Sequence, residues 1–140
     1  MIKITLLSIW WGAFTFYAGI VVPVGMKVLG SHTQMGFITQ EVAQYLNFLS
    51  IVIFVSYSYC LKKTPTQRHS LVQEILMVTL LGFQLILHYY LTDLLDFDKQ
   101  IIYNSALFYL LHRIYLIVET IIWLTVSGLI IKNLFEKDLD

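Results

Sequence analysis

The sequence predicts an all-α integral membrane protein, a four-helix bundle with both termini in the cytoplasm. Its 140 residues are 58% hydrophobic and only 13% charged, with a mean hydropathy of +0.74, outside the range of ordinary soluble domains. The apolar residues form four runs, each long enough for the roughly 20 residues that cross a bilayer. The basic residues are distributed unevenly between the connections, which predicts the orientation.

We expect residues 1–140 to form a single transmembrane domain with spans at about 4–29, 44–61, 71–95 and 105–134. The first run is longer than the roughly 7–15 apolar residues of a signal peptide, so it is read as an uncleaved span. Pro23 predicts a kink in its second half. The polar stretch 30–37 and the acidic turn 96–100 are expected to be outer connections, and 62–70 the inner one.

The distribution of basic residues favours this orientation, because six of them would lie inside and two outside. With both termini and the connection 62–70 inside, the positive-inside rule is satisfied, and the absence of a transit peptide favours a multi-pass protein of the bacterial inner membrane. The six inner residues are Lys3, Lys62, Lys63, Arg68, Lys132 and Lys137, and the two outer ones are Lys27 and Lys99.

Several function classes are disfavoured. The formal net charge is zero, which argues against a nucleic-acid partner. Four spans leave no room for a soluble catalytic domain, and the common phosphate-binding, dinucleotide-binding and zinc-protease motifs are absent. No catalytic residue or metal ligand set is assigned, and a non-enzymatic role is favoured over an enzyme.

Two features of the first span indicate packing. Its small residues Ser8, Gly12, Thr15 and Gly19 recur on one helical face, which allows another helix to approach closely and would serve a homo-oligomer. The adjacent Trp10 and Trp11 suit an interfacial aromatic belt.

The polar residues of the later spans are expected to point inward, because polar side chains are costly in lipid. At a rise of about 1.5 Å per residue, His88 and His112 are level, roughly 10 Å below the outer edge, with Glu119 about two turns deeper, near Gln84. Asn47 enters from the outer side to a comparable depth. The sequence therefore predicts one polar pocket in the outer half of the bundle.

This pocket could bind a small ligand, a metal or a cofactor, or serve an accessory subunit of a larger membrane complex. An intramembrane acid such as Glu119 often marks a proton or ion route, which would suit a small proton-coupled carrier. Alternatively, its carboxyl is neutral and donates a hydrogen bond to Gln84 or another inward partner. His88 and His112 could ligate haem b in a redox protein or oxidoreductase, or simply be hydrogen-bonded structural groups.

The chain resembles a family of small four-helix membrane proteins, the one containing the eukaryotic transmembrane protein two-hundred-and-five and its bacterial DUF4149-type relatives. The resemblance rests on Trp11-Gly12, on the segments 18–23 and 29–40 leading to Tyr45, and on the segment 108–112 that ends at His112. It implies a four-helix bundle and draws attention to His32 and His112.

A more distant resemblance is to the haem-linked CopD and HemJ families, through the Trp-x-Gly pattern of Trp10 and Gly12. Those families place a histidine in the first span, and this sequence has none there.

Overall fold

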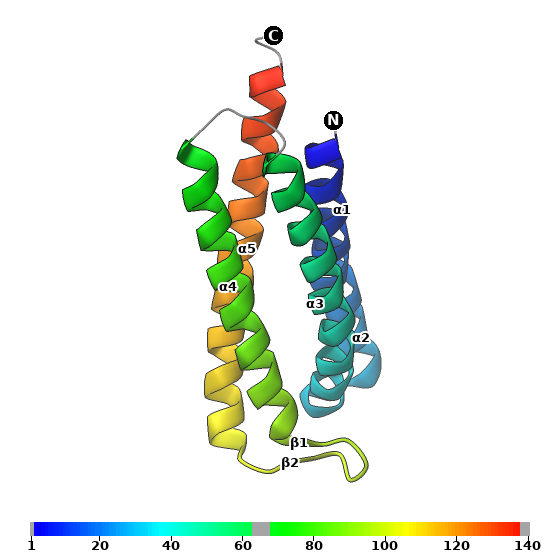
Figure 1. The fold of residues 1–140 in the computed structure, drawn as a ribbon. Helices are drawn as coiled ribbons and strands as arrows, with labels where there is room; N and C mark the ends of the chain where they lie inside the picture. The colour runs from blue at the N-terminus through cyan, green and yellow to red at the C-terminus, as the bar shows by residue number, and fades with distance from the viewer. Residues whose placement is uncertain (1, 63–67, 138–140) are drawn as a thin grey trace.

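The computed structural model describes residues 2–62 and 68–137, with side chains for 2–61 and 72–135. It is mostly helical (Figure 1). In chain order the elements are α1 (Ile2–Phe16), the π-helical turn η1 (Tyr17–Val21), α2 (Val22–Leu29), α3 (His32–Lys62), α4 (Arg68–Asp93), β1 (Leu95–Asp96), β2 (Ile101–Ile102) and α5 (Ser105–Lys137).

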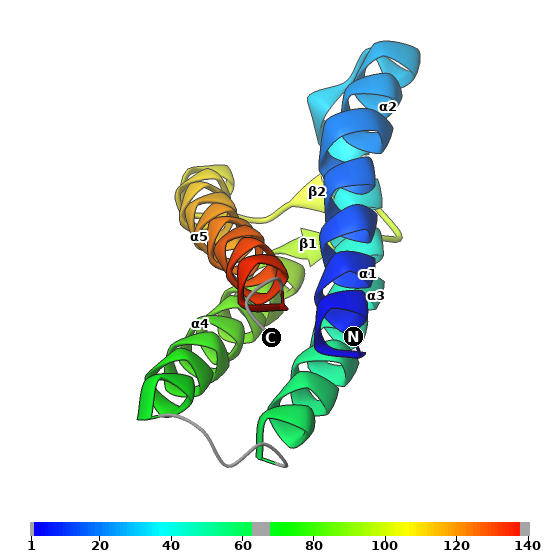
Figure 2. The same ribbon diagram turned by 90° about the horizontal axis from the view of Figure 1, so that it is seen from above.

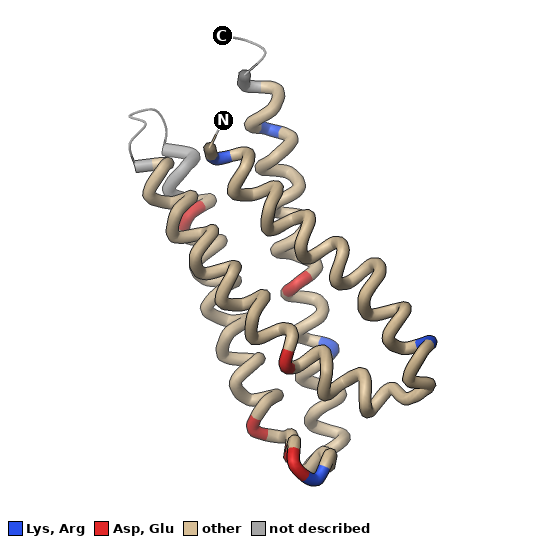
Figure 3. Tube along the Cα trace, turned by 90° about the vertical axis from the view of Figure 1, so that its right-hand side faces the viewer, with Lys and Arg blue, Asp and Glu red and all other residues tan. Residues whose placement is uncertain are grey.

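Four helical segments are long and apolar enough to cross a membrane: Ile2–Leu29, His32–Leu61, Val72–Asp93 and Ser105–Phe135. Contacts join α1 to α3, α3 to α4, α4 to α5 and α5 back to α1, and Figure 2 shows this arrangement from above. The start of α1 and the end of α5 lie at one end of the molecule, and the β1–β2 hairpin lies at the other (Figure 1). Charged residues are sparse along the middle of the helices (Figure 3).

The first span is irregular where Pro23 predicts a kink. Proline lacks the N–H that would bond to the carbonyl four residues back, at Gly19. The chain widens into a π turn just before it, and the N–H of Val22 bonds to the carbonyl of Tyr17, five residues back.

The prediction that residues 30–37 form a connection and that the second span begins near residue 44 is wrong. Gly30 adopts a left-handed conformation with φ of 62° and ends α2, where its N–H bonds to the Met26 carbonyl. Ser31 then caps α3, because its Oγ accepts the N–H of Gln34. A glycine stop followed directly by a serine cap encodes a two-residue turn, so α3 begins at His32.

The connection between α4 and α5 is also more ordered than a simple acidic turn. Leu95 pairs with Ile102, and Asp96 with Ile101, in a short antiparallel ladder. Asp96 Oδ1 accepts the N–H of Lys99 at 3.0 Å, and the Tyr103 hydroxyl donates to Asp96 Oδ2 at 2.7 Å. The predicted third span, to residue 95, therefore ends as α4 at Asp93. Of the predicted inner connection 62–70, residues 63–67 lie outside the described part of the chain.

The tryptophans join the helices instead of forming a belt at the membrane surface. Trp10 is only 2% exposed, and its indole N–H donates to Ser50 Oγ on α3 at 2.6 Å. Trp11 donates to Ser127 on α5, and Trp123 of α5 donates back to Thr15 on α1. An indole N–H buried among helices needs such a partner, so α1 is fixed between α3 and α5.

The small-residue face of the first span does not pack within the chain, apart from Thr15. Ser8, Gly12 and Gly19 are exposed, and a Cβ added at either glycine would meet nothing within 4 Å. At Gly25, by contrast, an added Cβ would lie 2.6 Å from the side-chain Sδ of Met35 on α3.

Candidate functional site

Asn47, Gln84 and Glu119 come together in the interior from α3, α4 and α5, as their spacing predicts. Their exposed fractions are 3%, 1% and 6%. Gln84 is at the centre, where its Nε2 donates to Asn47 Oδ1 at 2.8 Å and to Glu119 Oε1. One amide group thus connects three helices.

Two tyrosines extend this cluster, and neither was among the predicted site residues. The Tyr115 hydroxyl lies 3.4 Å from Gln84 Nε2 and is near enough to Glu119 and Asn47 to interact with both. Tyr17, in the π turn, lies within electrostatic range of Glu119 and contacts the Thr39 carbonyl at 3.5 Å. Tyr115 lies one helical turn from Glu119, a spacing that already indicates a shared face.

The cluster contains three buried polar atoms that have no hydrogen-bond partner among the described residues: Asn47 Nδ2, Gln84 Oε1 and Glu119 Oε2. The first is a donor and the other two are acceptors. Buried polar atoms are nearly always paired, so these three atoms mark the part of the cluster that the described side chains leave incomplete. Because two of the three are oxygens, a partner for them would donate hydrogen bonds or carry positive charge.

Glu119 has no basic partner among the side chains described for residues 2–61 and 72–135. Its contacts are the amide of Gln84 and the hydroxyl of Tyr115, both of which are neutral. A charged carboxylate without a counter-ion is expensive inside a membrane. A proton on Glu119 Oε2 would remove this charge and make that oxygen a donor, for which Gln84 Oε1 is the acceptor still unpaired.

A second polar group lies between this cluster and the β1–β2 end. Gln40 of α3 is 6% exposed, and its Nε2 contacts three groups on α4: His88 Nδ1 at 3.0 Å, the His88 carbonyl at 3.1 Å and Thr92 Oγ1 at 2.6 Å. The His88 ring also lies beside that of Tyr115, with centroids 6.4 Å apart. Gln40 was not among the predicted site residues.

His112 has different neighbours from His88. Its ring stacks on Phe108, one turn earlier in α5, with centroids 5.9 Å apart and an interplanar angle of 9°. The two imidazole rings therefore contact different side chains.

Gln40 holds the His88 ring from one side. The two hydrogens of its amide have the His88 carbonyl and Thr92 Oγ1 as acceptors. The direction of its contact with His88 Nδ1, at 3.0 Å, depends on the tautomer of the ring. Among the described residues, no group of three or more His, Cys, Asp or Glu side chains could hold a metal ion.

Comparison with protein-family models, curated proteins and solved structures gives no match to this chain. The two family resemblances therefore stay predictions.

Proposed function

We propose that this chain is a non-enzymatic membrane protein whose buried polar cluster binds a proton or a small hydrogen-bond-donating cation at Glu119. The supporting observation is the pair of unpaired acceptors, Gln84 Oε1 and Glu119 Oε2, in a cluster where the described residues supply no basic group. Asn47 and Tyr115 complete the binding groups from α3 and α5.

The proposal includes the arrangement in the membrane. The four spans form a bundle with both termini and the connection between α3 and α4 in the cytoplasm of a bacterial inner membrane. The positive-inside count supports this orientation. A C-terminal green fluorescent protein fusion should fluoresce, and an alkaline phosphatase fusion at the same position should be inactive. The reverse pattern would refute the orientation.

The binding site can be tested through the carboxyl group itself. In infrared spectra of the purified protein in nanodiscs, we expect the carbonyl stretch of a protonated carboxyl group at neutral pH. Glu119→Gln should remove this band. Glu41→Gln is the matched control, since Glu41 is an exposed glutamate on α3 and its replacement should leave the band in place. A band that survives Glu119→Gln, or no band at any pH at which the protein stays folded, would overturn the proposal.

A small proton-coupled carrier is a second candidate. It is favoured by the neutral partners of Glu119, Gln84 and Tyr115, because a carboxyl that is not held by a cation can gain and release a proton. The test is proton flux in proteoliposomes, in which the wild type should carry a flux that Glu119→Gln abolishes. Equal flux in both would exclude Glu119 from transport.

A further inference from the structure

The two ends of the molecule differ in what separates Glu119 from water. Toward the β1–β2 end, polar groups of three helices follow one another. Toward the end that carries the start of α1, hydroxyl groups pair with indoles among apolar side chains. If Glu119 binds a proton, this difference determines the side from which the proton comes.

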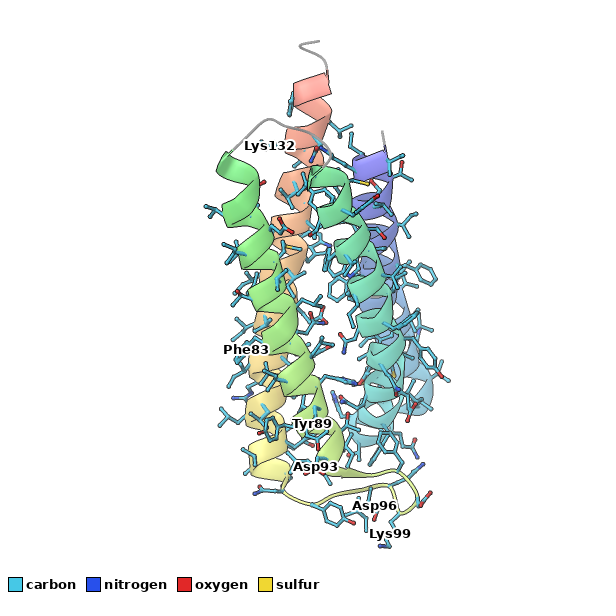
Figure 4. All side chains as sticks on the ribbon, in the orientation of Figure 1. Phe83, Tyr89, Asp93, Asp96, Lys99 and Lys132 are labelled. Atoms are coloured by element: carbon cyan, nitrogen blue, oxygen red, sulfur yellow. The ribbon has the colours of Figure 1, made fainter. Side chains whose placement is uncertain are left out.

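The polar groups that lead toward Glu119 from the β1–β2 end begin at a depression in the protein surface. It has a volume of about 300 Å³, is open on one side and is lined by Tyr89, Thr92, Asp93 and Leu95. Figure 4 shows Tyr89 and Asp93 on α4 near the hairpin. Thr92 belongs both to this depression and to the interior, because its hydroxyl accepts from Gln40 Nε2 at 2.6 Å.

The next part leads from Thr92 to Glu119. Gln40 connects Thr92 to His88 Nδ1 through the same amide nitrogen. The His88 ring lies against that of Tyr115, whose hydroxyl is near enough to Glu119 to interact with it. His88 is the titratable ring in this series between the depression and the cluster.

Acidic side chains lie near His88 and near the depression. Besides Gln40 and Tyr115, the acidic side chain of Glu41 on α3 is close enough for its charge to act on the ring. Asp93, one residue beyond Thr92, adds an exposed carboxylate at the depression. Negative charge near the entrance raises the local proton concentration.

In the opposite direction, apolar side chains and paired hydroxyl groups follow Glu119. The α5 positions Ile122 and Val126 are fully buried and apolar, and Leu7 of α1 is likewise fully buried. Ser50 accepts from Trp10 and donates to the Leu46 carbonyl. Ser127 accepts from Trp11 and donates to the Trp123 carbonyl.

We infer that Glu119 exchanges its proton with the β1–β2 side of the membrane by way of His88. The inference rests on the proposed proton site at Glu119. In each transfer, His88 takes up a proton on one ring nitrogen and releases the proton of the other to the Tyr115 hydroxyl, which passes its own proton to Glu119. The imidazole and the phenol are therefore neutral before and after. The Glu119 carboxylate becomes a carboxylic acid. Gln40 is a positioning residue, and its amide must turn away from Nδ1 for uptake at that nitrogen.

The test is the rate at which the Glu119 carboxyl band shifts when the protein in nanodiscs is transferred from H₂O to D₂O. His88→Leu should slow this exchange about a hundredfold, the lower end of what a positioned proton-transfer side chain contributes. His112→Leu is the matched control, because His112 stacks on Phe108 outside the series, and it should exchange at the wild-type rate. Thr92→Val should slow exchange as well, because it removes the hydroxyl group near the surface while keeping the shape of the side chain. It replaces His88→Leu as the test variant if His88→Leu does not fold.

The possible outcomes separate the two proposals. Absence of a Glu119 band refutes the proton site itself. A band that is present but exchanges at the wild-type rate in both His88→Leu and Thr92→Val refutes the route alone. Equal slowing by His88→Leu and His112→Leu would also refute it, since the effect would then not be specific to the series.

Discussion

Replacing Gln84 with leucine tests whether the buried cluster holds the helices together. Gln84 is 1% exposed, and the two hydrogens of its NH₂ group are donated to Asn47 Oδ1 on α3 and Glu119 Oε1 on α5. Interhelical hydrogen bonds in membrane proteins contribute about 0.6 kcal/mol each. Two such bonds give an expected loss of roughly 1 kcal/mol in the free energy of unfolding.

A double-mutant cycle isolates the link between the carboxyl and the amide. Glu119→Leu alone removes the bonds of Glu119 to Gln84 and to Tyr115 and should cost roughly 1 kcal/mol. In the double variant the bond between Gln84 and Glu119 is lost only once, so the combined cost should be about 0.6 kcal/mol below the sum of the two single costs. Both can be measured by reversible unfolding in mixed micelles, followed by tryptophan fluorescence.

The control is Gln44→Leu, which replaces an exposed glutamine on α3 and should not lower stability. Strict additivity of Gln84→Leu and Glu119→Leu would refute the energetic link between them. A loss below about 0.6 kcal/mol for Gln84→Leu, the contribution of one bond, would show that the cluster contributes little to the association of the helices.

Two further predictions concern packing and the hairpin. Gly25→Leu should lower the thermal unfolding temperature because its side chain would collide with Met35, whereas Gly12→Leu, with nothing within 4 Å of its Cβ, should leave it unchanged; equal shifts would contradict the packing. In the hairpin, the hydrogen bond from Tyr103 and the Lys99 backbone N–H hold the pKa of Asp96 below its usual range. The resulting stabilisation is present above the usual pKa of an aspartate and is lost as the pH falls through the lowered one. Tyr103→Phe should bring the Asp96 titration, followed by NMR of its side-chain carbonyl, to higher pH, and an unchanged titration would exclude the hydroxyl as a cause.

The inward faces of the later helices could be predicted because lipid penalises polar side chains, and this constraint is strong. Asn47, Gln84 and Glu119 are buried together for that reason. The start of α3 could not be placed from hydropathy, since its first turns are polar, although Gly30 and Ser31 carry the local signals for a stop and a cap.

The roles of Trp10 and Gln40 depend on neighbours far away in the chain. A tryptophan near a helix end suits either the membrane surface or the interior, and the choice depends on whether a hydroxyl such as that of Ser50 faces it. Gln40 likewise became part of the candidate site only through its contacts with His88 and Thr92. Helical spacing gives the face of a residue but not its partner on another helix.

The bonds that α5 makes have a consequence for how the protein is assembled during synthesis. The first helix enters the membrane with the indole of Trp11 unpaired, because its acceptor, Ser127, is near the far end of the chain. The amide of Gln84 likewise meets Glu119 only when α5 has been inserted. Every shorter nascent chain therefore exposes polar groups to lipid, a state that membrane quality-control proteases could distinguish from the finished protein.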